Sequence, residues 1–311
     1  MSTFITVTKK ELEDHFNSWR FMILLFMLLA AIAYVFLAAG NIKSAATGSD
    51  EFIFLSLFTS TAVQTSSSLV PYSFLSLMAT LLPVAGIILG LDAINSERNN
   101  GTLSRLVSQP IYRDNIINAK FAAGIITIAL ILISIILLVS AMGLRMLGVP
   151  PSIEEILRLF IFLIIGIIYG GFWLGLAILF STLFKQVAVS AILAIAVWLF
   201  FTVFYPIIYT SIISQSTTLA DAQTAINIVR ISPIFLFNES MIVTLMPAAR
   251  SASQVLQLLS TDAGNFLLTT PLTLTQSLIS VWSQITISIV LTAVCFAVAY
   301  IKFMFEEIRS L

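Results

Sequence analysis

Six long apolar runs alternate with polar segments along the chain, and each is long enough to cross a membrane as a helix. A spanning helix needs about 20 apolar residues, because it rises about 1.5 Å per residue through a hydrocarbon core about 30 Å thick. The expected spans are 21–39, 74–91, 121–142, 159–184, 187–205 and 281–301. The pattern therefore predicts an all-α integral membrane protein in which residues 1–311 form a single transmembrane domain.

The polar segment before the first span, residues 1–20, carries charges of both signs. It lacks the basic, apolar and small-residue layout of a cleaved signal peptide. We expect an amphipathic helix at the membrane interface, with Trp19 and Arg20 at the level of the lipid headgroups. The lone histidine, His15, is expected to be solvated.

Two further polar segments contain apolar stretches. Residues 52–58 are apolar within a Ser- and Thr-rich connection, which predicts a segment lying along the membrane surface. Residues 207–280 are too polar for a span, yet a structureless segment of this length would be unusual. We expect it to be extracytoplasmic and to form short helices packed against the bundle.

Local signals refine the ends and interiors of the spans. Pro83 lies inside the second span, where it should kink the helix or free a carbonyl, which membrane helices tolerate when neighbours satisfy the backbone. Ser152, followed three residues later by Glu155, predicts a capping box at the start of the fourth helix. Pro206 predicts an end or a kink of the fifth span.

Composition supports the membrane assignment. Hydrophobic residues make up 59% of the chain and charged residues 10%, with a mean hydropathy of +1.05, whereas about a quarter of a soluble domain is charged. The net charge is zero, which gives no indication of a nucleic-acid partner. The single cysteine, Cys295, cannot form an intramolecular disulfide.

The distribution of basic residues predicts the orientation in the membrane. Ten of the 15 lie in the amino-terminal segment, the 97–120 connection, the turn at Lys185 and the carboxyl tail, and the other five are spread over longer loops on the opposite side. Basic residues accumulate on the cytoplasmic side. We therefore expect a multi-pass protein of the cell (plasma or inner) membrane with both termini in the cytoplasm.

The 97–120 connection is the longest polar island between two spans. Leu103, Leu106 and Val107 are three and four residues apart, so a short helix here would present one apolar face. Gly101 suits the start of such a helix, and Pro110 limits it to about two turns. The pattern alone fits equally a helix lying on lipid and a helix that docks into a partner protein.

The same connection resembles the signature between the second and third spans of type-2 ATP-binding-cassette (ABC) permeases, the membrane subunits of a large exporter family. The residues that carry the resemblance are Glu97, Arg98, Gly101, Thr102, Leu103, Leu106, Pro110, Ile111, Arg113 and Lys120. The resemblance implies a cytoplasmic coupling helix that docks on an ATPase subunit. Its docking face would be Thr102, Leu103 and Leu106, and its lead-in Glu97 and Arg98.

The resemblance further implies export by alternating access and a second permease copy or a paralogue in the same bilayer. The chain has no Gly-x-x-x-x-Gly-Lys phosphate loop, so ATP and Mg are expected on a separate ATPase chain and no cofactor on this one. No catalytic or metal-binding residue is expected, because the only histidine lies outside every span.

Two alternatives stay open, an ion-coupled secondary transporter and a non-transporting membrane scaffold. A secondary transporter usually carries charged groups near the middle of the bilayer. The nearest such residue here is Asp92, at the end of the second span, where we expect a structural role rather than ion binding.

Three glycine pairs have the spacing that lets membrane helices approach closely. We expect them to serve packing within the chain rather than a dimer seam. They are Gly86 with Gly90, Gly166 with Gly170, and Gly171 with Gly175.

Overall fold

Helices account for all regular structure in the part of the chain that the computed structural model describes, which contains no strand. The described residues are 3–46, 52–59, 74–99, 101, 112–148, 150–214, 224, 226–247 and 272–305. Five helices in these ranges are long and apolar enough to cross a membrane, or up to six if a bent pair at the amino terminus counts as one span. The all-α membrane fold is confirmed, while a count of six spans stays a prediction.

The longer helices lie at each expected span and extend beyond most of them, although residues 91 and 184 fall just outside. They are α1 (Thr3–Phe16), α2 (Trp19–Ala46), α4 (Phe74–Gly90), α7 (Arg113–Leu147), α8 (Ile153–Leu183), α9 (Val187–Leu199), α10 (Tyr205–Ser214), α12 (Pro233–Leu245) and α14 (Leu274–Phe305). Shorter elements are the 3-10 turn η1 (Ile53–Leu55), α3 (Ser56–Thr59), α5 (Asn95–Asn99) and the π-helical turn η2 (Phe200–Phe204).

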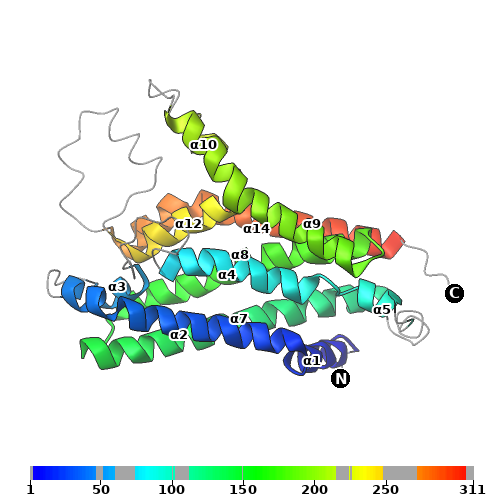
Figure 1. The fold of residues 1–311 in the computed structure, drawn as a ribbon, viewed down its shortest axis with the longest axis horizontal. Helices are drawn as coiled ribbons and strands as arrows, with labels where there is room; N and C mark the ends of the chain where they lie inside the picture. The colour runs from blue at the N-terminus through cyan, green and yellow to red at the C-terminus, as the bar shows by residue number, and fades with distance from the viewer. Residues whose placement is uncertain are drawn as a thin grey trace.

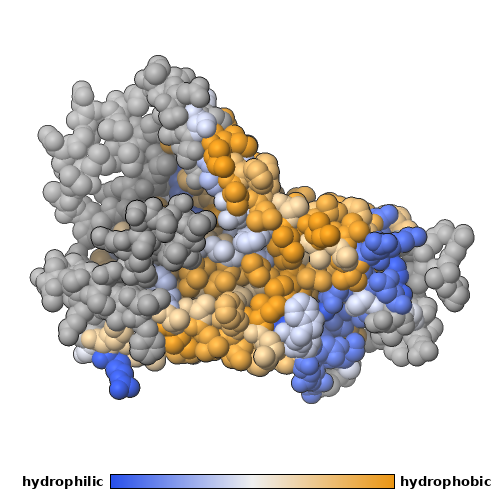
Figure 2. Space-filling view, in the orientation of Figure 1, coloured by the Kyte–Doolittle hydropathy of each residue, from blue (hydrophilic) through white to orange (hydrophobic). Residues whose placement is uncertain are grey.

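Most of the long helices run roughly side by side, and α8 lies at the centre of the bundle (Figure 1). It packs against α4, α7, α9, α12 and α14. Its Trp173 and Phe162 are fully buried. One end of the bundle carries α1, α5 and the end of α14, and we call it the α5 end; the other carries α3 and the start of α8, and we call it the α3 end. Figure 2 shows hydrophobic surface across the middle and hydrophilic residues gathered at the α5 end, as expected for a membrane-spanning bundle.

The contact between α4 and α8 depends on glycine. A Cβ atom on Gly86 would lie 2.7 Å from the carbonyl oxygen of Gly170, and one on Gly90 would lie 2.9 Å from that of Leu174. Both obstacles are backbone atoms, so any side chain at these two positions would force the helices apart. These glycines therefore allow the two backbones to touch.

The remaining glycines of the predicted pairs lie on α8 and face other helices of the same chain. A Cβ atom on Gly166 or Gly170 would meet side chains of α7, 3.0 Å away in each case. One on Gly171 would lie 2.7 Å from Ile125, also on α7, and one on Gly175 would have 3.7 Å to Phe121. All the close neighbours of the six glycines thus come from within one chain.

The segment 52–59 does not lie along the surface, and that expectation is wrong. Leu55, Leu57 and Phe58 are at most 1% exposed, and Phe58 packs edge-on against Phe74 at a centroid distance of 5.2 Å. Its apolar residues are buried among helices at the α3 end because burial in the bundle removes more apolar surface from water than the interface does. The first turn of α8 holds the segment in place: the predicted capping box of Ser152 and Glu155 is confirmed, and Glu155 Oε1 also accepts the backbone N–H of Phe54 at 2.9 Å.

Arg158 of α8 joins three elements at the same end. Its side chain is fully buried, and all five of its N–H groups find acceptors. It donates to Glu154 at 2.8 and 3.2 Å, to the carbonyls of Thr244 and Leu272 at 2.7 Å each, and to the Ser277 hydroxyl at 3.2 Å. The guanidinium thereby ties α8 to the last turn of α12 and to the start of α14.

The helix after α8 does not end at Pro206. It continues from α9 through η2 into α10, to Ser214. Proline cannot donate to the carbonyl four residues back, and its ring clashes with that carbonyl in a regular helix. The carbonyl concerned, that of Thr202, lies within the π-helical turn 200–204, where the helix is wider. The wider turn accommodates the proline, and the helix continues beyond it.

Candidate coupling site at the α5 end

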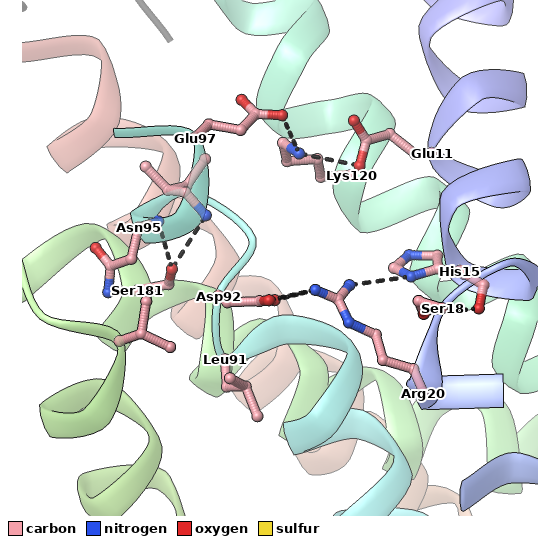
Figure 3. A network of polar contacts seen from close by, with 12 residues as sticks. Glu11, His15, Ser18, Arg20, Leu91, Asp92, Asn95, Glu97, Lys120 and Ser181 are labelled. Atoms are coloured by element: carbon pink, nitrogen blue, oxygen red, sulfur yellow. Dashed lines mark hydrogen bonds and ion pairs between the residues drawn. The ribbon is translucent and has the colours of Figure 1, made fainter. Parts of the chain in front are cut away.

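A buried lysine joins three helices beside the polar island. Lys120 of α7 lies 2.8 Å from Glu97 of α5 and 2.9 Å from Glu11 of α1 (Figure 3). The side chains of all three are at most 11% exposed. Ion pairs so shielded from water are screened little by salt, so this triad fixes the positions of α1 and α5 against α7.

A second ion pair lies nearby. The Arg20 guanidinium, at the start of α2, binds both carboxylate oxygens of Asp92, which lies between α4 and α5 (Figure 3). The Arg20 side chain is 16% exposed, and its position at the level of the lipid headgroups stays a prediction. The partly buried carboxylate of Asp92, just after α4, binds it, which agrees with the structural role expected of Asp92.

His15 completes this second group and is not solvated, contrary to expectation. It is 4% exposed and lies in the last turn of α1, beside the 67° bend into α2. Arg20 donates to His15 Nδ1 at 3.3 Å. A guanidinium has only donors, so Nδ1 must accept and the ring proton sits on Nε2. Burial, reinforced by the Arg20 charge, lowers the pKa of His15 from 6.5 to about 4.

Two serines hold the break between α4 and α5. Ser181 Oγ of α8 accepts the backbone N–H groups of Ile94 and Asn95 at 3.1 and 3.2 Å, and Figure 3 shows it below the first turn of α5. Ser190 Oγ of α9 donates to the carbonyl of Leu91 at 2.8 Å and accepts from Asn95 Nδ2 at 3.3 Å. Sequence reasoning missed both, since isolated serines are common in membrane helices and nothing in their spacing distinguishes these two.

The structure describes part of the predicted docking motif. Glu97 and Arg98 lie in α5, and Arg113 is the first residue of α7. Gly101 has a φ of +67°, which favours glycine, and its N–H donates to the Arg98 carbonyl at 3.2 Å, so it ends α5. Thr102, Leu103, Leu106 and Pro110 lie outside the described residues. The structure therefore places the lead-in beside Lys120, and the docking face stays a prediction.

No site for a metal ion occurs in the described ranges, since they hold no group of three His, Cys, Asp or Glu side chains that could bind one. The buried charged groups at the α5 end are instead bonded to each other. The arrangement holds α1, α2 and α5 against neighbouring parts of the bundle.

A family model described as "ABC-2 family transporter protein" matches residues 5–308, nearly the whole chain. The chain belongs to the ABC-2 transporter family. This permease is also similar to two curated relatives, each named a probable ABC transporter permease protein NosY. It is 26% identical over 215 residues to the one from Pseudomonas aeruginosa, covering 68% of this chain and 71% of the relative. It is 27% identical over 216 residues to the one from Stutzerimonas stutzeri, covering 68% and 70%.

Family membership confirms the resemblance and makes this chain a membrane-spanning subunit of an ABC transporter. A subunit of this kind is a transporter component rather than an enzyme, and the family implies nucleotide binding in a partner. The triad of Lys120, Glu97 and Glu11 lies within the matched region, at the base of the connection that carries the predicted docking helix.

Proposed function

We propose that this chain is the permease subunit of an ATP-driven exporter, and that residues 102–111 dock on a separate ATPase subunit that carries ATP and Mg. The observation that carries the proposal is the Lys120 triad. Residues 102–111 are joined to α5 on one side and, through Tyr112, to α7 on the other. Lys120 binds Glu97, so the two flanking helices are tied together directly.

An attachment in which the two flanking helices are joined by a buried ion pair suits the transfer of force from a soluble subunit. A flexible attachment would absorb the displacement of a docked ATPase, whereas two buried ion pairs on one lysine pass it to α7 and α1. Binding of ATP closes the two ATPase subunits, and a closure that binds one arrangement of the helices more tightly than the other shifts the permease between them. That difference in affinity is what drives a change in access to either side of the membrane.

A second permease copy or a paralogue would complete the transporter. Support comes from α9, α10 and α14, whose outer faces expose large apolar residues such as Ile192 at 66%, Ile207 at 61% and Trp282 at 63%. Within one chain, the most apolar windows of the helix from Val187 to Ile208 and of α14 are each only 11% buried. These faces can be covered by lipid and by a second copy in the same bilayer.

The ion-coupled alternative has less support from the described residues. A coupling ion needs charged or polar groups that are available inside the bundle. Arg158, the fully buried arginine of α8, uses all its donors in hydrogen bonds to α12, α14 and its own helix. Its bonds are those of a structural residue.

Substitutions in the docking face test the proposal. Leu103→Asp and Leu106→Asp place a charge on the apolar face, so we expect each variant to insert and purify normally but to lose co-purification with an ATP-binding-cassette ATPase. The matched control is Ile153→Asp, because Ile153 is 80% exposed in the first turn of α8 at the opposite end. Retention of the ATPase by both docking-face variants would contradict the proposed docking.

A further inference from the structure

The break between α4 and α5 is held by side chains from two other helices. The chain leaves α4 at Gly90 and enters α5 at Asn95. A helix end leaves backbone N–H and C=O groups without partners, and at the edge of a membrane these need protein partners. Ser181 of α8 and Ser190 of α9 supply them, and both side chains are fully buried.

Ser181 fixes the start of α5. A helix is normally capped by a residue just before it in the chain, but here the Oγ atom of a distant serine accepts both Ile94 N–H and Asn95 N–H. Two hydrogen bonds to one oxygen define the direction of the first turn as well as its position. A displacement of α5 must therefore move Ser181, or break both bonds.

Ser190 makes a contact that can exchange. Its single hydroxyl hydrogen has two acceptors within reach, the Leu91 carbonyl at 2.8 Å and the Val187 carbonyl of its own helix at 2.9 Å. If α4 moves away, the hydrogen can turn to Val187 and the hydroxyl is not left unbonded. Asn95 is likewise suited to two arrangements: its Nδ2 donates to Ser190, while its buried Oδ1 finds no donor in the described part of the chain. An unsatisfied buried acceptor favours any arrangement that gives it a donor.

We propose that Ser181 and Ser190 are positioning residues that carry the movement of α5 into α8 and α9, Ser181 as a fixed clamp and Ser190 as an exchanging contact. The inference rests on the proposed function, because a docked ATPase is what moves α5. It extends that function: displacement of the docking connection reaches the centre of the bundle through α8 and does not stop at the two helices that flank the connection.

Amide hydrogen exchange on the full chain in lipid nanodiscs tests the clamp without any ATPase. In Ser181→Ala, we expect the amides of Ile94 and Asn95 to exchange about tenfold faster or more, because both lose their acceptor. The matched control is Ser134→Ala, whose hydroxyl bonds only the Leu130 carbonyl of its own helix. Unchanged protection of Ile94 and Asn95 in Ser181→Ala would overturn the clamp, whatever the fate of the proposed function.

Transmission is tested in the complex with the ATPase. A cysteine at Ala188, which is exposed in the first turn of α9, is introduced with Cys295→Ala, and its maleimide labelling rate is measured with and without ATP and vanadate. In the otherwise unchanged chain we expect nucleotide to alter the rate about fivefold, the lower end of typical coupling between sites.

The serine variants decide the outcome. We expect Ser181→Ala and the Ser181→Ala, Ser190→Ala pair to bind the ATPase and hydrolyse ATP but to lose the nucleotide-dependent change, and Ser134→Ala to keep it. A full nucleotide-dependent change in the double variant would overturn the proposal. If no ATPase binds the unsubstituted chain, the proposed function fails, and that failure is visible before any serine is changed.

Discussion

The hydroxyl of Tyr169, in α8, donates to the carbonyl oxygen of Ala79, in α4, at 2.9 Å. Ala79 precedes Pro83 by four residues, so its carbonyl is the one that loses its helical donor to the proline. The expectation that a neighbour would satisfy this carbonyl is confirmed. The Tyr169 ring also stacks on Phe237 of α12 at a centroid distance of 4.2 Å, so one side chain links three helices.

The pairing of Tyr169 with the proline-freed carbonyl predicts a coupled effect on stability. Tyr169→Phe removes the donor and leaves a buried acceptor unpaired, which should cost about 1 to 3 kcal/mol. In a Pro83→Ala background, residue 83 regains an N–H for Ala79, so the same substitution should cost much less. Thermal unfolding of the four proteins measures the coupling. Equal costs in both backgrounds would show that Tyr169 does not serve the freed carbonyl.

Close packing of α4 on α8 predicts that glycine is required at position 86 but not at position 175. Gly86→Ala drives a methyl group into the backbone of α8, with atoms at 2.7 and 2.9 Å, and should destabilise by about 1 to 3 kcal/mol. Gly175→Ala is the matched control, because its nearest neighbours lie at 3.7 Å. Unfolding midpoints compare the two. An equally tolerated Gly86→Ala would mean that the helices can separate there without penalty.

The Lys120 triad predicts a strong dependence on its one cation. Lys120→Met removes the ammonium that binds both Glu11 and Glu97, while Glu11 keeps a longer contact of 3.6 Å with Lys10. We therefore expect a loss of about 3 kcal/mol of stability, the lower end of the cost of breaking a buried ion pair. Adding Glu11→Gln and Glu97→Gln to Lys120→Met should restore much of the lost stability, since the buried negative charge is then removed. The measurement is unfolding of the single and triple variants in detergent. No recovery in the triple variant would contradict an electrostatic role.

The lowered pKa of His15 predicts a loss of stability in mild acid. Above pH 6.5 the ring is neutral in both the folded and the unfolded chain, so His15 does not make the free energy of unfolding depend on pH there. Between pH 6.5 and about 4 the unfolded chain binds the proton more readily, so the free energy of unfolding falls as the pH falls. The difference between the ordinary pKa of 6.5 and the folded-state pKa of about 4 corresponds to a total loss of about 3 kcal/mol in the free energy of unfolding.

His15→Gln isolates this contribution. A neutral glutamine cannot take up the proton, so the variant should lose less stability than the parent chain across the same interval. Unfolding midpoints from pH 7.5 to pH 4 provide the comparison. Parallel curves for the two proteins would indicate that His15 titrates near its ordinary pKa.

The features predicted correctly from the sequence depend on local patterns. Helix length and class follow from the length of the apolar runs, and the capping box of Ser152 and Glu155 follows from its spacing. The family followed from the polar residues between two spans, of which Glu97 and Lys120 are now seen in contact. Apolar length and short motifs are properties of neighbouring residues, so a sequence reveals them directly.

The features that were missed depend on contacts between distant parts of the chain. His15 was expected in water, because nothing in residues 1–20 indicates that Arg20 binds it and that Asp92 lies opposite. The burial of residues 52–59 depends on their contacts with α2, α4, α7 and α12, which the local pattern does not indicate. The roles of Ser181 and Ser190 depend on where α8 and α9 lie against the break between α4 and α5, which the sequence around either serine does not indicate.

Partnership with an ATPase is the central claim, and purification from native membranes tests it most directly. The tagged chain is extracted from its own host in mild detergent, and the associated proteins are identified by mass spectrometry, with Leu103→Asp as the matched control. We predict that an ATP-binding-cassette ATPase accompanies the unsubstituted chain in about equal amount and is absent from the control. Recovery of the permease without any such ATPase, or an equal amount of it with Leu103→Asp, would contradict the account.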